Sequence, residues 1–235
     1  MTDALRMARS SHMAGNLSLA EQLYMEILKD RPDNIFAYYE LGNVFQDKGQ
    51  LDEAILCYRK AIETNPHFTE PYNNLGNVYR KKGRLDEAET YYRIAVKAMP
   101  DFFGSYYNLG ETLREKGLLD EAIECYRKAL TLNPGHVATM NNLGTALREK
   151  GEIESAIACY RQAILLNPHV PESHSNLAHA LLLLGHLEEA LRGRLRGHCH
   201  DFASVRPSFL RIALRTPDGL MGWPRTSPQQ STSTR

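Results

Sequence analysis

Amide side chains recur at a fixed interval along this chain of 235 residues. An amide offers both a hydrogen-bond donor and an acceptor, the two groups that an extended peptide backbone presents in turn. Such side chains could bind a peptide with little regard to its sequence, or they could hydrogen-bond only within the chain. The recurring set, spaced 34 residues apart, is Asn74, Asn108, Asn142 and Asn176, and neighbouring positions add Asn43 and Asn77.

A second row with the same interval is basic. It consists of Arg80, Arg114 and Arg148, and Glu115 and Glu149 directly follow the last two. Mixed charge of this kind is typical of a solvated helix face. The arginines could also bind acidic side chains of a partner segment, because guanidinium and carboxylate groups form strong hydrogen-bonded pairs. Both interpretations stay open.

The remaining reactive side chains form no catalytic pattern. Cys57, Cys125 and Cys159 share one repeat position, and equivalent positions of stacked helix pairs lie farther apart than the ~7 Å between Cα atoms that a disulfide tolerates. The adjacent ligands of His198-Cys199-His200 seldom converge on one ion, so we expect no metal site. We see no nucleophile–base pair, P-loop or dinucleotide turn. The expectation is a chain without catalysis or a cofactor.

Prolines define the interval, because Pro32, Pro66, Pro100, Pro134 and Pro168 are each 34 residues apart. We number each unit so that this proline is position 32. The units are then 1–34, 35–68, 69–102, 103–136, 137–170 and a partial unit, 171–190. A period between 20 and 50 residues predicts a solenoid of stacked units.

Each unit is predicted to contain two helices. In residues 69–102, apolar residues follow helical spacing up to Gly83, and a second such run ends at Pro100. Glycine ends a helix at little cost in the left-handed conformation. Gly or Ala at position 8 and Ala at position 20 would let the two helices approach closely, while tyrosines at position 24 and other large residues fill the layer between units.

This register resembles the tetratricopeptide repeat (TPR) family over residues 1–190. The resemblance implies an all-α fold, a right-handed α-α superhelical solenoid whose concave face is lined by the first helix of each unit. It also implies partners that are protein or peptide segments bound in that concave groove. The candidate peptide-binding residues are then Asn43, Asn74, Asn77, Asn108, Asn142, Asn176, Arg80, Arg114 and Arg148.

The Asn-Leu-Gly runs at 74–76, 108–110 and 142–144 resemble the repeat region of protein O-linked N-acetylglucosamine transferases and their bacterial relatives. In those enzymes the repeats precede a catalytic domain, for which this chain has no room. The same resemblance argues against a chaperone-type carboxylate clamp, which needs Lys at position 5. Tyr39, Asn73, Tyr107 and Asn141 stand there instead.

Composition limits the other function classes. The chain has 28 basic and 28 acidic side chains, so nucleic acid is an unlikely partner on charge alone. No apolar run approaches the ~20 residues that span a bilayer, and the N-terminus shows no secretion signal, so we expect a cytoplasmic protein without membrane insertion.

Composition changes after residue 190. The tail, residues 191–235, is rich in Arg, Pro and Ser and holds eight Arg and two Asp. It could be a disordered basic tail, it could form a short capping helix over 203–215, or it could be the product of a frameshift. If the sixth unit is uncapped, it could also mediate self-association.

These observations predict a non-catalytic scaffold for protein–protein interaction that binds extended peptide segments. The alternative is that the chain is a truncated or frameshifted substrate-recognition arm of a glycosyltransferase resembling the transferases named above.

Overall fold

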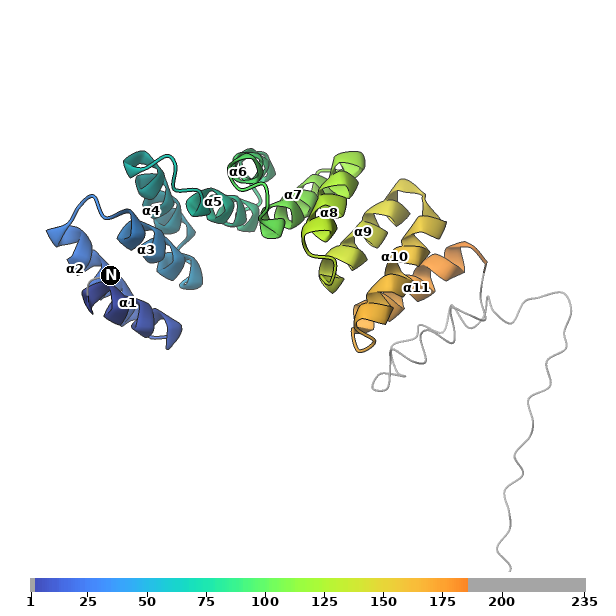
Figure 1. Cartoon of the computed structure of the whole chain (residues 1–235), viewed down its shortest axis with the longest axis horizontal. Helices are drawn as coiled ribbons and strands as arrows, with labels where there is room; N and C mark the ends of the chain where they lie inside the picture. The colour runs from blue at the N-terminus through green and yellow to red at the C-terminus, as the bar shows by residue number, and fades with distance from the viewer. Residues whose placement is uncertain (1–2, 186–235) are drawn as a thin grey trace, which may run out of the picture. The chain divides into compact units, whose positions relative to one another are not determined.

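The computed structural model describes residues 3–185, which form eleven α-helices and no strand (Figure 1). In chain order these are α1 (Asp3–Met13), α2 (Leu17–Asp30), α3 (Ile35–Asp47), α4 (Leu51–Thr64), α5 (Glu70–Lys81), α6 (Leu85–Ala98), α7 (Phe103–Glu115), α8 (Leu119–Leu132), α9 (Val137–Lys150), α10 (Ile153–Leu166) and α11 (Pro171–Leu183). Each complete 34-residue unit therefore contributes two helices, as the repeat predicts.

The helices pack in chain order. The two helices of a unit pack against each other, and the second helix then packs against the first helix of the next unit. The first helices of successive units are also in contact, as α5 is with α7, α7 with α9 and α9 with α11. Side chains on these odd-numbered helices can therefore meet across unit boundaries. The described residues form the all-α solenoid that the sequence predicts.

Helix α6 shows how the sequence sets these boundaries. Gly83, with φ +73°, lies in the left-handed region just before the helix, where a side chain would be strained. Asp86 and Glu87 stand in the first turn, where negative charge is favourable beside the helix N-terminus. At the other end, the N–H of Met99 donates to the carbonyl of Ala95, and Pro100 follows. Pro100 cannot extend the helix.

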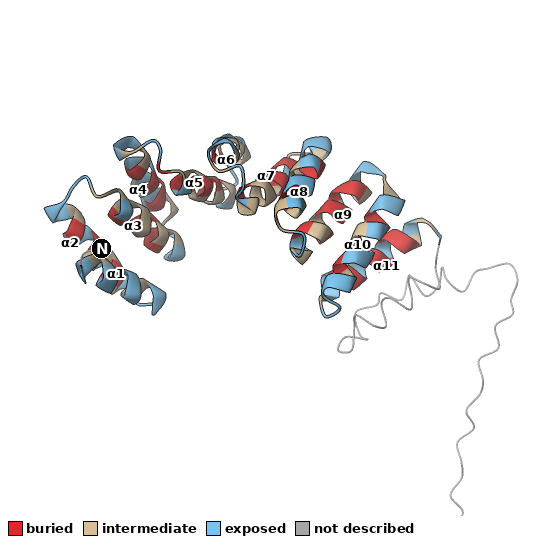
Figure 2. Cartoon of the chain, viewed as in Figure 1, coloured by how far each residue is buried: buried red, intermediate tan, exposed pale blue. Residues whose placement is uncertain are grey.

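The core repeats with the same register, and every described helix contributes buried residues to it (Figure 2). Its largest members are the position-24 tyrosines, each with no exposed surface: Tyr24, Tyr58, Tyr92, Tyr126 and Tyr160. In units two to five each tyrosine ring lies over the glycine at position 8. A Cβ on Gly42 would be 2.6 Å from the ring of Tyr58. Glycine is therefore required for the observed approach of the two helices.

Several predictions concern residues outside the described range. The tail 191–235, its proposed capping helix at 203–215 and the His198-Cys199-His200 cluster all lie there, as do the last residues of the partial unit 171–190.

Candidate functional site

The recurring asparagines, here called the asparagine row (Asn74, Asn108, Asn142 and Asn176), lie on the first helices of units three to six. Three of them donate the side-chain N–H to position 9 of the preceding unit. Asn74 Nδ2 lies 2.8 Å from Asn43 Oδ1, Asn108 Nδ2 lies 3.1 Å from Asn77 Oδ1, and Asn142 Nδ2 lies 3.0 Å from Glu111 Oε1. The row is thus tied from unit to unit by side-chain hydrogen bonds.

Buried tyrosines hold the acceptors of these bonds in place. The Tyr58 hydroxyl donates to Asn43 Oδ1 at 2.7 Å, and the Tyr92 hydroxyl donates to Asn77 Oδ1 at 2.6 Å. Burial raises the pKa of Tyr92 well above its ordinary value of 10, so this hydroxyl keeps its proton at neutral pH. Asn43 and Asn77 are therefore positioning residues for the row.

The hydrogen bonds of the row leave its oxygens open. Within residues 3–185, no donor reaches Oδ1 of Asn74, Asn108 or Asn142. None of these three oxygens is both buried and without a partner, so each of them is exposed to water. Each amide is held by its nitrogen and offers an acceptor. A backbone N–H of a bound segment is a suitable donor for such an acceptor.

Asn176 differs from the other three. It is half-buried on α11, and its side chain has no hydrogen-bond partner among residues 3–185. In the unit before it, Asn141 donates Nδ2 to Ser173 Oγ at 2.8 Å, while its own Oδ1 is buried without a partner. The equivalent oxygen of Asn73 accepts instead from Asn108, at 3.2 Å. The inter-unit bonding of the row is therefore incomplete at its last member.

Two of the three candidate arginines are engaged by the next unit. Arg80 on α5 forms an ion pair with Glu111, and its other carboxylate neighbour, Glu115, lies 3.7 Å away. Arg114 Nη1 on α7 lies 3.0 Å from Glu149 Oε1. These contacts match the interpretation of a mixed-charge helix face at Arg80 and Arg114. Arg148 occupies the equivalent position on α9 and is half-buried.

Glu111 links the two rows and was missed by sequence reasoning. Its carboxylate accepts from Asn142, from the Tyr107 hydroxyl at 3.0 Å and from Arg80. The signal was present in the sequence, because Glu111 stands at position 9, where Asn43 and Asn77 stand in earlier units. Burial and the nearby Glu111 carboxylate raise the pKa of Tyr107 to about 12, so it stays a donor.

A third inter-unit relationship was also missed. Lysines at position 14 pair with an acid at position 18 of the preceding unit, 30 residues earlier. Lys82 pairs with Asp52, Lys116 Nζ lies 2.6 Å from Asp86, and Lys150 Nζ lies 2.7 Å from Asp120. Position 18 of the first unit is Ser18, and there Lys48 pairs with Glu21 instead. Ion pairs with an exposed partner add little stability each.

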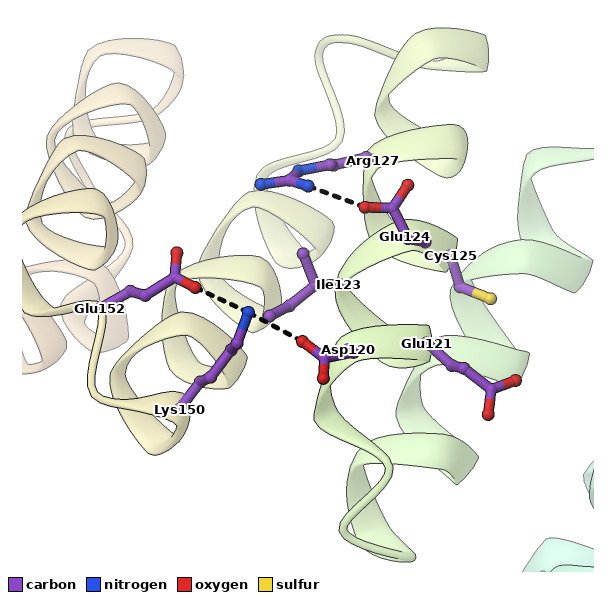
Figure 3. Close-up of a pocket in the computed structure, with 8 residues that line it drawn as sticks. All are labelled: Asp120, Glu121, Ile123, Glu124, Cys125, Arg127, Lys150 and Glu152. Carbon is purple, nitrogen blue, oxygen red and sulfur yellow. Dashed lines mark hydrogen bonds and ion pairs between the residues drawn. The ribbon is translucent and has the colours of Figure 1, made fainter.

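The shallow depression drawn in Figure 3 lies away from the asparagine row. It has a volume of about 340 Å³ and is lined by α8 together with Lys150 and Glu152. Lys150 points between Asp120 and Glu152 and pairs with both, so its charge is already neutralised. Burial raises the pKa of Cys125, which also lines the depression, to about 11. A protonated thiol and a paired lysine make no nucleophile here.

Other sites are lacking in the described part of the chain. Cys57, Cys125 and Cys159 are free and half-buried. Residues 3–185 contain no group of three His, Cys, Asp or Glu side chains placed to hold a metal ion. None of their helices is both long and apolar enough to cross a membrane.

Comparisons with known proteins agree with this architecture. Tetratricopeptide repeat models match residues 23–55, 42–82, 70–102, 101–166 and 141–198. No curated protein matches the sequence. The chain is similar in structure to MamA from Desulfovibrio magneticus RS-1, with 20% identity, a TM-score of 0.66 and coverage of 72% of this chain and 97% of that one.

Two further solved structures share the fold. One is PilF of Pseudomonas aeruginosa, with 18% identity, a TM-score of 0.74 and coverage of 91% of this chain and 96% of that one. The other is YrrB, described as a TPR protein with an unusual peptide-binding site, with 20% identity, a TM-score of 0.66 and coverage of 74% and 90%. At these identities the likeness concerns the fold alone. The five repeat models and the repeated helix pairs lead to one conclusion: the chain belongs to the tetratricopeptide repeat family and is built as a protein-interaction scaffold.

Proposed function

We propose that this chain binds extended peptide segments along the asparagine row, without catalysis of its own. The observation that carries this proposal is the state of Asn74, Asn108 and Asn142. Each amide nitrogen is used by the preceding unit, and each amide oxygen is open to water. Acceptors repeated once per unit suit the N–H groups of an extended backbone.

Rigidity favours this use of the row. The amides do not have to be ordered on binding, because Asn43, Asn77 and Glu111 already hold them, and buried tyrosines hold Asn43 and Asn77. Binding to preorganised groups loses less conformational entropy. YrrB, which shares the fold, is described as having a peptide-binding site, and this supports a peptide as the ligand class.

The proposed partners are protein or peptide segments, selected mainly through their backbone. The cytoplasm is the proposed setting, because the three free thiols at position 23 suit a reducing compartment. The alternative function is that of a substrate-recognition arm of a glycosyltransferase. Hydrolysis or transfer of a sugar nucleotide by the purified chain would contradict the non-catalytic proposal.

The direct test removes the amides of the row. The variant Asn74→Ala/Asn108→Ala/Asn142→Ala and the wild type are compared for capture of a random peptide library displayed on phage. We expect at least a tenfold loss of captured phage, because three backbone hydrogen bonds are lost.

A matched control removes three amides elsewhere. Asn65, Asn133 and Asn167 are the C-cap residues of α4, α8 and α10, at the ends of the second helices. Their triple alanine variant should keep wild-type capture. Circular dichroism melting of both variants identifies any loss that is due to unfolding. Equal capture by folded row variant and wild type would reject the asparagine row as the binding site.

A further inference from the structure

Basic and acidic side chains meet between position 12 of one unit and position 13 of the next, 35 residues later. His12 Nε2 lies 2.8 Å from Asp47 Oδ2 across the first boundary. Arg80 and Glu115 are related in the same way at 3.7 Å, as are Arg114 and Glu149 at 3.0 Å. Three unit boundaries therefore place a basic side chain at position 12 opposite a carboxylate, and at two of them it is an arginine.

The boundary between units five and six has a cation at position 12 but no carboxylate at position 13. Arg148 stands at position 12 of unit five, and position 13 of unit six is Leu183, which is 55% exposed. Position 9, which supplies Glu111 to Arg80, is His179 in unit six. No carboxylate within residues 3–185 pairs with Arg148, whereas Arg80 and Arg114 each have one.

One other unit boundary lacks a pair between positions 12 and 13, but for a different reason. At the boundary between units two and three, Gln46 stands at position 12 and Lys81 at position 13. Lys81 is exposed on α5, so water hydrates its charge fully, and a partner would gain little by pairing with it. Arg148 is half-buried and its Nε is buried without a hydrogen-bond partner. A partly desolvated cation gains more from a bound anion than an exposed one does.

Arg148 also lies next to the asparagine row. At the boundary between units two and three, the Tyr58 hydroxyl lies 3.4 Å from Oε1 of Gln46, at position 12, and 3.5 Å from Asn74 Nδ2 in the next unit. Position 12 of a unit is therefore close to the row member of the next unit, which for Arg148 is Asn176. Asn142 is the row member of the same unit as Arg148, with its oxygen open to water. A segment bound along the row from Asn142 to Asn176 would therefore pass close to the guanidinium of Arg148.

We propose that Arg148 binds one Asp or Glu side chain of the peptide held by the asparagine row, and so fixes the peptide's register. This inference rests on the proposed function, because the row supplies the backbone contacts. Backbone contacts alone cannot distinguish one register from the next along an extended peptide. Arg148 can distinguish them, because it has no carboxylate partner within residues 3–185, whereas Arg80 and Arg114 are already paired with glutamates.

The structure supplies a matched pair of arginines for the test. Arg114 and Arg148 occupy the same repeat position and both have a buried, unpartnered Nε, but only Arg114 meets a carboxylate. Leu183→Glu offers a second route, because it places a carboxylate at the position where Arg114 finds Glu149 and leaves Arg148 in place. Leu183 is more than half exposed, so this variant should fold.

The experiment selects random peptides, amidated at the C-terminus in one library and with free C-termini in a second, on the wild type, Arg148→Gln, Leu183→Glu and Arg114→Gln. The captured peptides are then sequenced. We expect the wild type and Arg114→Gln to enrich Asp or Glu at one peptide position about tenfold over Gln and Asn. Arg148→Gln and Leu183→Glu should both lose that enrichment while still capturing peptides.

Four outcomes overturn the inference. Capture by the wild type without acidic enrichment rejects it and leaves the proposed function standing. Enrichment that appears only with free C-termini assigns Arg148 to a terminal carboxylate instead of a side chain. Enrichment that survives in Arg148→Gln places the acidic contact elsewhere. A library that fails to bind the wild type at all refutes the proposed function itself, and the inference with it.

Discussion

A Cβ atom on Gly76 would lie 2.5 Å from Cε1 of Tyr92. The same pairing of position 8 with position 24 occurs in three other units, between Gly42 and Tyr58, Gly110 and Tyr126, and Gly144 and Tyr160. The tyrosine hydroxyl at the far end of this contact reaches Asn77, which holds Asn108. Close approach of the two helices and the order of the asparagine row therefore depend on one contact.

A larger residue in place of Gly76 should overpack its contact with the ring of Tyr92. We expect Gly76→Ala to lower the free energy of unfolding by about 1–3 kcal/mol, and Gly76→Leu by more, because the ring of Tyr92 is buried and cannot move into solvent. Urea denaturation followed by circular dichroism measures both. The double variant Gly76→Ala/Tyr92→Leu should recover part of the loss. Unchanged denaturation midpoints would show that the helices can separate freely.

Glycine at position 15 is needed for a different reason. An added Cβ on Gly83 would meet nothing within 4 Å, but its φ of +73° is strained for any side chain. We expect Gly83→Ala to cost about 1–2 kcal/mol through the backbone alone, and Gly83→Asn to cost less, since Asn tolerates the left-handed region. Thermal melts of the two variants test the order. Equal melting of Ala and Asn variants would argue against backbone strain.

Low pH should destabilise the contact between α6 and α7, because Glu89 becomes protonated there. Burial alone would raise the pKa of Glu89, but hydrogen bonds from Lys116 and Arg93 outweigh it and hold that pKa below its ordinary value of 4.5. A carboxyl group whose pKa is lower in the folded state than in the unfolded state stabilises the fold at pH values above its unfolded-state pKa. That stabilisation is lost as the pH falls through its folded-state pKa.

The matching measurement compares unfolding midpoints at about pH 6 and about pH 3, on either side of the ordinary carboxyl range. The wild type should lose more stability on acidification than Glu89→Gln does. Glu154→Gln, at an exposed position of α10, serves as the control and should keep the wild-type loss. An identical acid response of wild type and Glu89→Gln would contradict the role assigned to Glu89.

The repeat cysteines should react slowly. Burial raises the pKa of Cys57 to about 12 and that of Cys125 to about 11, and only the thiolate is nucleophilic. We expect iodoacetamide to alkylate Cys125 about a hundredfold and Cys57 about a thousandfold more slowly at pH 7 than in the urea-denatured chain, as pKa rises of about two and about three units require. Site-resolved mass spectrometry gives the rates. Native rates equal to the denatured ones would show that these positions open readily.

The sequence of each repeat unit determined the helices and turns of this protein. The spacing of Pro32 and its equivalents, Gly at position 15 and the helical apolar pattern predicted the helix pairs that the structure shows. Gly76 was expected at a close contact between the two helices of its unit because small residues recur at that position, whereas its contact with Tyr92 was found only in the structure. These features depend on interactions within one unit, over at most about 16 residues, so each unit's own sequence specifies them.

The state of the candidate site was decided only by the stacking of units. Arg114 and Arg148 both stand at position 12, but among the described residues only Arg114 is paired with a carboxylate. The difference lies 35 residues away, at Glu149 and Leu183. Likewise, the spacing of Asn74 could not say which end of its amide the neighbouring unit uses. Contacts between residues 27 to 35 positions apart depend on how one helix pair is placed on the next. That placement results from the packing of whole faces, which no single repeat position encodes.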